Sequence, residues 1–239
     1  MLPLRDTIRS YSFPAVNWLL IGINVVVFLF QISLPPAALD QLILAFGVVP
    51  ARLHLDQPWL LLSNPLPLAT LFTHMFLHGG WFHILSNLWI LYIFGDNVED
   101  RMGSLRYLVF YLFCGTAAGL LQAWFTPASN TPAIGASGAI AGVLGAYFLM
   151  FPRARVITLV PLFFVPWFVE IPSLVFLGFW FVSQLFSGIG SLGMAASGGG
   201  VAWWAHVGGF VVGMLVHRLF TPRRHPVYTR VYPDEYWPW

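Results

Sequence analysis

Charged side chains are scarce in this sequence. Asp, Glu, Lys and Arg make up 8% of its 239 residues, whereas hydrophobic residues make up 58%. Soluble globular domains carry about 25% charged residues, so this composition excludes an ordinary water-soluble protein. The formal net charge of +2 is too small to indicate a nucleic-acid partner. The composition therefore predicts a protein that crosses a lipid bilayer several times.

Cysteine is nearly absent as well. Cys114 is the only one, so the chain has no intramolecular disulfide. A cleavable signal peptide is also not expected. Arg5 and Arg9 precede a long apolar segment, but no small-residue cleavage site follows it. The first apolar segment is therefore predicted to remain as a membrane span.

Uncharged stretches of unusual length divide the chain. They cover residues 10–39, 57–95, 107–152 and 171–217. A spanning helix needs roughly 20 residues, so each of the last two stretches can hold two spans, separated by turn-rich segments. The sequence predicts an all-α bundle of six transmembrane helices, at about residues 14–34, 80–95, 105–125, 137–151, 171–187 and 201–219.

The arginines indicate how these spans are oriented. All eleven basic residues are Arg, and with six spans only Arg52 falls on the outer side. The positive-inside rule then places both termini in the cytoplasm. We expect three parts: a cytoplasmic segment at 1–13, a six-span membrane domain at 14–219 and a cytoplasmic tail at 220–239.

Two connecting segments are themselves apolar. Residues 156–169 include Pro161 and Pro166 and are too few to span the bilayer, so we interpret them as an interfacial cytoplasmic loop. Residues 35–70 form a long outer loop, which we expect to lie partly in the membrane surface and to pack on protein there.

Ser137 stands where a polar, proline-flanked loop meets a glycine-rich apolar segment. Serine at a helix start is commonly an N-cap. Gly135 and Gly138 favour a second interpretation, because they let the backbone turn sharply and expose N–H groups beside the positive end of the helix dipole. Those features suit an oxyanion hole beside a serine nucleophile. From the residues alone, both interpretations stay open.

His206 is the predicted partner of Ser137. It lies in the last span, and Gly209 and Gly213 follow on the same helical face. A GxxxG pair is typical of close helix contact in membranes. Ala141 belongs to a matching stripe of small residues after Ser137. If the two faces meet, the imidazole can take the hydroxyl proton; the alternative is a histidine hydrogen-bonded within the bundle.

His83 and Asn87 are the third candidate element. They are four residues apart and therefore share one helical face. Both could donate hydrogen bonds to an oxyanion, or they could join neighbouring helices.

Other reaction types lack the residues that they need. The predicted spans contain no acidic residue, which favours a Ser–His dyad over a triad and excludes an aspartyl mechanism. His74 and His78 have helical spacing, but no Glu lies between them in an HExxH pattern. A structural or ligand role for this pair stays open. No metal or organic cofactor is expected.

Together, the three motifs resemble the rhomboid intramembrane serine proteases. The motifs are His83-x-x-x-Asn87, Gly135-x-Ser137-Gly138 and His206-x-x-Gly209-x-x-x-Gly213, in that order. The resemblance covers residues 14–219. Within it, the run Phe94–Asp100 is similar to bacterial members of the family. It implies a bacterial inner-membrane protease with Ser137 as nucleophile and His206 as base. It also implies an oxyanion hole formed by His83, Asn87 and the Ser137 N–H, with membrane proteins as substrates.

The sequence departs from the rhomboid pattern in two places. Many members carry Tyr or Phe four residues after the nucleophile, against the histidine, whereas this chain has Ala141. We expect Trp203 or Trp204 to position His206 instead. Many members also carry a Trp-Arg pair in the outer loop, where Ala69-Thr70 stands here.

Two other functions are weighed against proteolysis. A non-catalytic relative could bind transmembrane helices, but such relatives typically lack the Ser or the His, and this chain has both. A transporter is less favoured, because we find neither repeated halves nor buried charges along a path.

Overall fold

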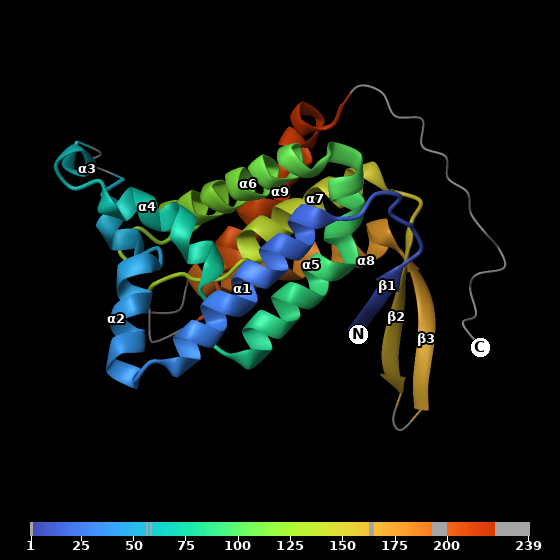
Figure 1. Ribbon diagram of the computed structural model, residues 1–239, viewed down its shortest axis with the longest axis horizontal. Coiled ribbons are helices and arrows are strands. Elements are labelled where there is room, and N and C mark those ends of the chain that lie inside the picture. The colour runs from blue at the N-terminus through green and yellow to red at the C-terminus, as the bar shows by residue number, and fades with distance from the viewer. Residues whose placement is uncertain (1, 56, 58, 163–164, 193–199, 223–239) are drawn as a thin grey trace.

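Six long helices form the body of the molecule in the residues that the structure describes (Figure 1). The computed structural model describes residues 2–55, 57, 59–162, 165–192 and 200–222. The expected cytoplasmic tail at 220–239 lies outside these residues from 223 onward. The long helices are α1 (Ala15–Ser33), α5 (Trp81–Met102), α6 (Ser104–Phe125), α7 (Ser137–Met150), α8 (Ser173–Leu192) and α9 (Trp203–Phe220).

Each of these helices overlaps one predicted span, and α5 and α8 continue beyond their spans to Met102 and Leu192. Within the described residues, α1, α6 and α8 are long and apolar enough to cross a membrane by length and composition. The helical membrane bundle predicted from the sequence is confirmed. Its middle is α7, whose residues from Gly138 to Tyr147 are all buried. A helix that is apolar and buried all round belongs inside a bundle, and α7 packs on α5, α6, α8 and α9.

A three-stranded antiparallel sheet joins one end of the bundle. Its strands are β1 (Leu2–Asp6), β2 (Arg155–Leu162) and β3 (Val165–Pro172), in the order β1-β2-β3. The interpretation of 156–169 as an interfacial loop was therefore wrong about its conformation, because most of the segment lies in two strands. The segment is rich in Val, Ile, Phe and Trp, which favour strands. Pro161 pairs with Pro166 beside the turn, so both prolines lie at the end of the hairpin.

The residues before the second span form short helices rather than an extended loop. These are α2 (Pro36–Phe46), η1 (Pro50–Leu53), α3 (Leu60–Ser63), α4 (Leu66–Thr73) and η2 (His74–Phe76). Thr73 Oγ1 donates to the Phe46 carbonyl at 2.7 Å, and Arg52 Nη1 donates to the Leu44 carbonyl at 2.7 Å. These two bonds connect the short helices of this segment. The segment has Ala69-Thr70 at the place where the Trp-Arg pair was described above.

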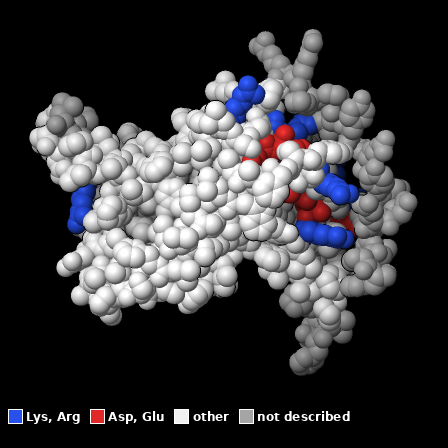
Figure 2. Space-filling view, in the orientation of Figure 1, with Lys and Arg blue, Asp and Glu red and all other residues white. Residues whose placement is uncertain are grey.

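Charged side chains gather at the sheet end of the molecule (Figure 2). Glu99, near the end of α5, is buried and accepts hydrogen bonds from the N–H groups of Val16 at 3.0 Å and Asn17 at 2.7 Å. It also accepts from Ser104 Oγ at 2.5 Å. One carboxylate therefore accepts from N–H groups at the start of α1, which have no partner within the helix, and from a hydroxyl at the start of α6. Its negative charge also interacts favourably with the positive ends of both helix dipoles.

Candidate active site

Ser137 is the first residue of α7, directly after a tight turn. Gly135 in that turn has a φ of 124°, a conformation that glycine adopts without steric cost. Its N–H donates to the His74 carbonyl at 2.9 Å. The N-cap position belongs to Ala136, and no side chain caps the helix there. The Ser137 hydroxyl is therefore available to a partner outside its own helix.

That partner is His206, in the first turn of α9. Ser137 Oγ lies 2.8 Å from His206 Nε2. The structure thus brings together two residues that are 69 positions apart in the sequence. This is the spacing at which a hydroxyl proton can pass to a ring nitrogen.

Two tryptophans pack against the His206 ring. The Trp203 ring meets it edge-on, with centroids 6.1 Å apart, and the Trp180 ring lies 6.0 Å away at 32°. Of the two tryptophans expected to contact this ring, Trp203 does so. Trp204 instead stacks on Phe125, with centroids 3.9 Å apart. Aromatic rings from α8 and α9 therefore contact His206 in a chain that has the small Ala141 four residues after Ser137.

Gln184 is a site residue that sequence reasoning missed. Its Oε1 lies 2.8 Å from His206 Nδ1, so His206 is bonded at both ring nitrogens. The side chain is 8% exposed. A signal was present in the sequence, because an amide inside an apolar span usually has a buried partner.

Close contact between α7 and α9 makes the Ser137–His206 distance possible. A Cβ added at Gly209 would lie 2.0 Å from the Gly138 carbonyl oxygen, and one at Gly213 would lie 2.0 Å from that of Gly142. Glycine alone fits at such separations. The stripe of small residues on each helix therefore meets the other, as the spacing of these residues predicts.

His83 and Asn87 lie on α5, which packs on α7. The Gly79 N–H donates to His83 Nδ1 at 3.2 Å, so Nδ1 accepts and Nε2 carries the ring proton. Asn87 is 6% exposed, and among the described residues its Nδ2 has no hydrogen-bond partner. Buried donors are rarely left unpaired, and such exceptions often mark functional groups.

The space between His83 and Ser137 is kept open by Gly135. A Cβ at Gly135 would lie 2.7 Å from His83 Nε2 and 3.6 Å from Ser137 Oγ. An atom there would thus stand between a hydrogen-bond donor and the hydroxyl. Chemically, this is where the oxygen of a bound carbonyl group could sit.

His74 and His78 have different surroundings, although their spacing is helical. His74 is buried, and its Nδ1 lies 3.0 Å from the Thr70 carbonyl. His78 is held at its backbone by Gln31, and its ring lies 5.1 Å from that of His83. Among the described residues, no three His, Cys, Asp or Glu side chains gather as metal ligands would. The His74 carbonyl contributes instead by holding Gly135.

Comparison with known proteins identifies the family of the chain. The Rhomboid domain family matches residues 66–223, a segment that contains all of the site residues described above. The chain belongs to the rhomboid family.

Several curated rhomboid proteins are similar to the chain. Rhomboid protein 1, mitochondrial, from Saccharomyces cerevisiae is 28% identical over 59% of the chain and 38% of its own length. Rhomboid protease GluP from Bacillus subtilis is 30% identical over 56% of the chain and 24% of its own length. Rhomboid-like protein 11, chloroplastic, from Arabidopsis thaliana is 42% identical over 30% of the chain and 25% of its own length. The matches thus span less than half of each relative.

Proposed function

We propose that this rhomboid is an intramembrane serine endopeptidase, with Ser137 as nucleophile and His206 as general base. Its substrates are membrane proteins, cut in or next to a transmembrane helix. The observation that carries the proposal is the 2.8 Å contact between Ser137 Oγ and His206 Nε2. Family membership supports it, as does the likeness to a Bacillus subtilis protein that is named a rhomboid protease.

The reaction needs two acyl transfers, the first from the substrate to Ser137 and the second from Ser137 to water. Its Oγ attacks the scissile carbonyl carbon while His206 Nε2 takes the hydroxyl proton. The tetrahedral adduct then expels the amine, which takes that proton from Nε2, and an ester is left on Ser137. Water attacks the ester in the same way: Nε2 takes its proton and returns it to Ser137 Oγ, which releases the acid product.

The hydrogen bonds behind His206 select the tautomer that this chemistry requires. The Trp180 carbonyl can only accept, so the Ser183 hydroxyl donates to it, at 2.6 Å. Ser183 Oγ then accepts from Gln184 Nε2 at 3.0 Å, which leaves Gln184 Oε1 facing His206. An amide oxygen can only accept, so the ring proton sits on Nδ1. Nε2 is therefore bare and can receive the proton of Ser137.

We assign the oxyanion hole to His83 Nε2, Asn87 Nδ2 and the Ser137 N–H. Asn87 Nδ2 has no acceptor within the described residues, and His83, whose Nε2 carries the ring proton, lies four residues before it on the same face of α5. Donors placed where charge develops typically contribute more to the rate than other single groups. Gly135 keeps the space open, and Gly138, Gly209 and Gly213 bring the two helices close enough for the dyad.

The depth of the site suits a reaction inside the bilayer. Helix α7 has 14 residues, about 21 Å at the usual helical rise, whereas the hydrocarbon core is about 30 Å thick. With the other end of α7 at the cytoplasmic surface, Ser137 lies below the outer surface of the membrane. Irregular backbone such as the turn before Ser137 is tolerated at that depth where it is buried in protein or lines a water-filled cavity. Such a cavity would also supply water, which is the second substrate of the reaction.

The chain is an integral membrane protein, and we further propose its setting. The arginine distribution supports six spans with both termini in the cytoplasm. The proposal of a bacterial plasma membrane rests on the resemblance of residues 94–100 to bacterial rhomboids, whereas two of the relatives named above are mitochondrial and chloroplastic. Reporter fusions at the two termini test the orientation: a reporter active only in the cytoplasm should work at both ends.

Cleavage of a single-span reporter protein in liposomes tests the proposed activity. Wild-type protein should cut it, and Ser137→Ala and His206→Ala should not. Equal cutting by all three would show that another nucleophile is responsible. If none of them cuts any of a panel of membrane substrates, the chain instead has the alternative, non-catalytic role of binding transmembrane helices.

A further inference from the structure

The hairpin of β2 and β3 has two chemically different faces. Side chains alternate between the faces of a strand. Val156 and Thr158 are both fully buried, and they share a face with Asp6 and Pro3, their partners on β1. Asp6 bonds to Asn97 of α5 at 2.9 Å, so this face points toward the helices.

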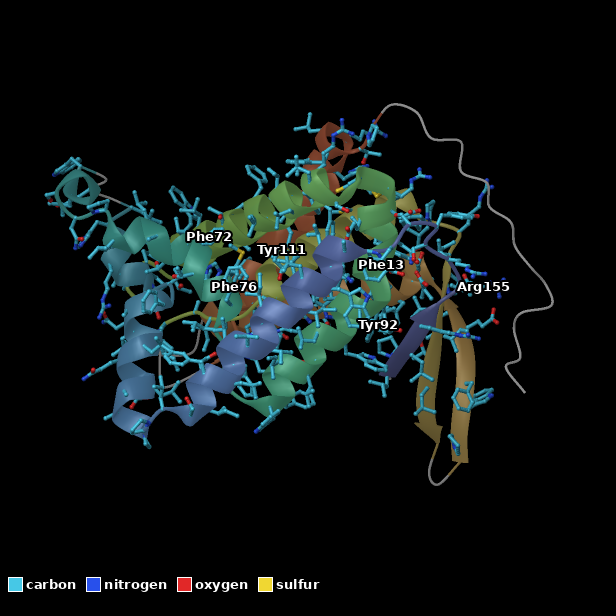
Figure 3. The ribbon with its side chains drawn as sticks, in the orientation of Figure 1. Phe13, Phe72, Phe76, Tyr92, Tyr111 and Arg155 are labelled. Carbon is cyan, nitrogen blue, oxygen red and sulfur yellow. The ribbon has the colours of Figure 1, made fainter. Side chains whose placement is uncertain are left out.

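The opposite face carries the charges of the hairpin. Arg155 and Glu170 form an ion pair with 3.4 Å between Nη1 and Oε2. Arg155 alternates with the buried Val156 and so lies on the opposite face; Figure 3 labels it beside the strands, at the end of the molecule away from the long helices. Phe168 lies on the same face, because it pairs with Leu159 of β2.

The face that points toward the helices stays apolar beyond the point where they cover it. Its next pair after Thr158 is Val160 with Trp167. Trp167 is 58% exposed, although it lies on the same face of the hairpin as the fully buried Val156 and Thr158. Figure 1 shows the hairpin projecting sideways past the end of the bundle. Here the sheet faces the zone beside the helices, which in a membrane protein holds lipid.

A group of aromatic residues marks the level of the membrane at this point. Trp18 and Trp89 pack on Tyr92, with ring centroids 5.8 and 6.4 Å away, and all three side chains are exposed. Trp and Tyr exposed on membrane helices collect at the headgroup level. Trp89 Nε1 also donates to the Pro3 carbonyl of β1 at 2.6 Å. The sheet is thus tied to the aromatic level itself.

We propose that the Trp167 face of the hairpin lies in the headgroup–acyl boundary of the adjacent membrane leaflet. The occupant of this face is lipid, with the Trp167 ring among the upper acyl chains. The face with Arg155, Phe168 and Glu170 points to water. The hairpin thereby anchors the sheet end of the bundle in the plane of the membrane. This inference depends on the membrane bundle and not on protease activity.

Residues 167 and 168 make a matched pair for the test. They are adjacent, equally exposed at 58% and 57%, and on opposite faces of the hairpin. Trp167→Cys and Phe168→Cys would each be labelled with a small fluorophore in lipid nanodiscs. Wild-type protein gives the labelling background, because Cys114 is buried. Quenching is then measured with a lipid that is spin-labelled high on its acyl chain and, separately, with aqueous iodide.

We expect several-fold stronger lipid quenching at position 167 than at 168, and the reverse with iodide. Equal quenching at the two positions by both quenchers would overturn the proposal. Protection of position 167 from both the lipid quencher and iodide would also overturn it, because the face would then be covered by protein, such as a second copy of the chain. Thermal unfolding of both labelled variants shows whether the fold is intact.

Discussion

His206 Nδ1 and Gln184 Oε1 lie 2.8 Å apart and connect α9 to α8. Through this bond, the orientation of the base depends on a helix that contributes neither Ser137 nor His206. A displacement of α8 that broke this bond would therefore remove the acceptor that fixes the tautomer and the angle of the imidazole.

Gln184→Leu keeps the size of the side chain but removes the acceptor for Nδ1. We expect kcat to fall at least about tenfold, the value of one hydrogen bond, with little change in KM. Gln184→Glu retains an acceptor oxygen and should recover much of the loss. Kinetics on the reporter substrate measure both effects.

Ser183 and Ser191 provide a control pair for this prediction. Both donate to a carbonyl three residues earlier on α8, at 2.6 Å, but only Ser183 contacts Gln184. Ser183→Ala should lower kcat and Ser191→Ala should not. If Gln184→Leu is as active as wild type, the tautomer argument is wrong.

Asn87→Ala separates catalysis from stability. Loss of one oxyanion donor should reduce cleavage about a hundredfold. The melting temperature should not fall, because the Nδ2 that is removed has no partner in the described structure. Asn24 is a contrasting case, since its Nδ2 donates to the Leu20 carbonyl at 2.8 Å. Asn24→Ala should lower the melting temperature instead. A loss of stability in Asn87→Ala without a loss of rate would contradict the oxyanion assignment.

Gly209→Ala tests the contact between α7 and α9. The new Cβ would lie 2.0 Å from the Gly138 carbonyl oxygen, so the helices must separate. We expect a loss of about 1–3 kcal/mol in stability, as for other overpacked sites, together with a slower reaction. Gly22→Ala on α1 is the control, because its Cβ would meet nothing within 4 Å. Thermal unfolding in detergent compares the two, and equal melting temperatures would argue against the close contact.

Asp6 should make the stability of the protein depend on pH. Burial raises its pKa from 3.8 to about 7, and the charge of Asp96 adds to this, while the bond from Tyr147 opposes it. The folded protein therefore holds this proton more tightly than the unfolded chain does. The resulting stabilisation is complete below about pH 4 and is lost as the pH rises through about 7.

Asp6→Asn removes this titration while keeping an acceptor for Tyr147. The melting temperature of the variant should therefore rise relative to that of wild type as the pH increases from about 5 to 8. Asp40→Asn, at an exposed position on α2, is the control. If wild type and Asp6→Asn show the same pH dependence of melting, the burial of this carboxyl group has no such effect.

The helices and the Ser137–His206 pair could be predicted because both depend on local spacing. Uncharged stretches of sufficient length mark the spans, and the small residues around Ser137 and His206 recur at helical intervals. Gln184 could not be assigned in the same way, since its contact with His206 depends on how α8 rotates against α9. The hairpin could not be predicted from span length, which shows only that residues 156–169 are too few to cross the bilayer, since its strands depend on pairing with each other and with β1.

The central claim is that Ser137 is activated by His206, and a fluorophosphonate probe tests it without a substrate. The probe would be added to wild type, His206→Ala and Ser137→Ala in the same membranes, and the modified peptide would be identified by mass spectrometry. We predict an adduct on Ser137 in wild type and little or none in the two variants. An adduct that forms equally fast in His206→Ala, or on a different serine, would contradict the account.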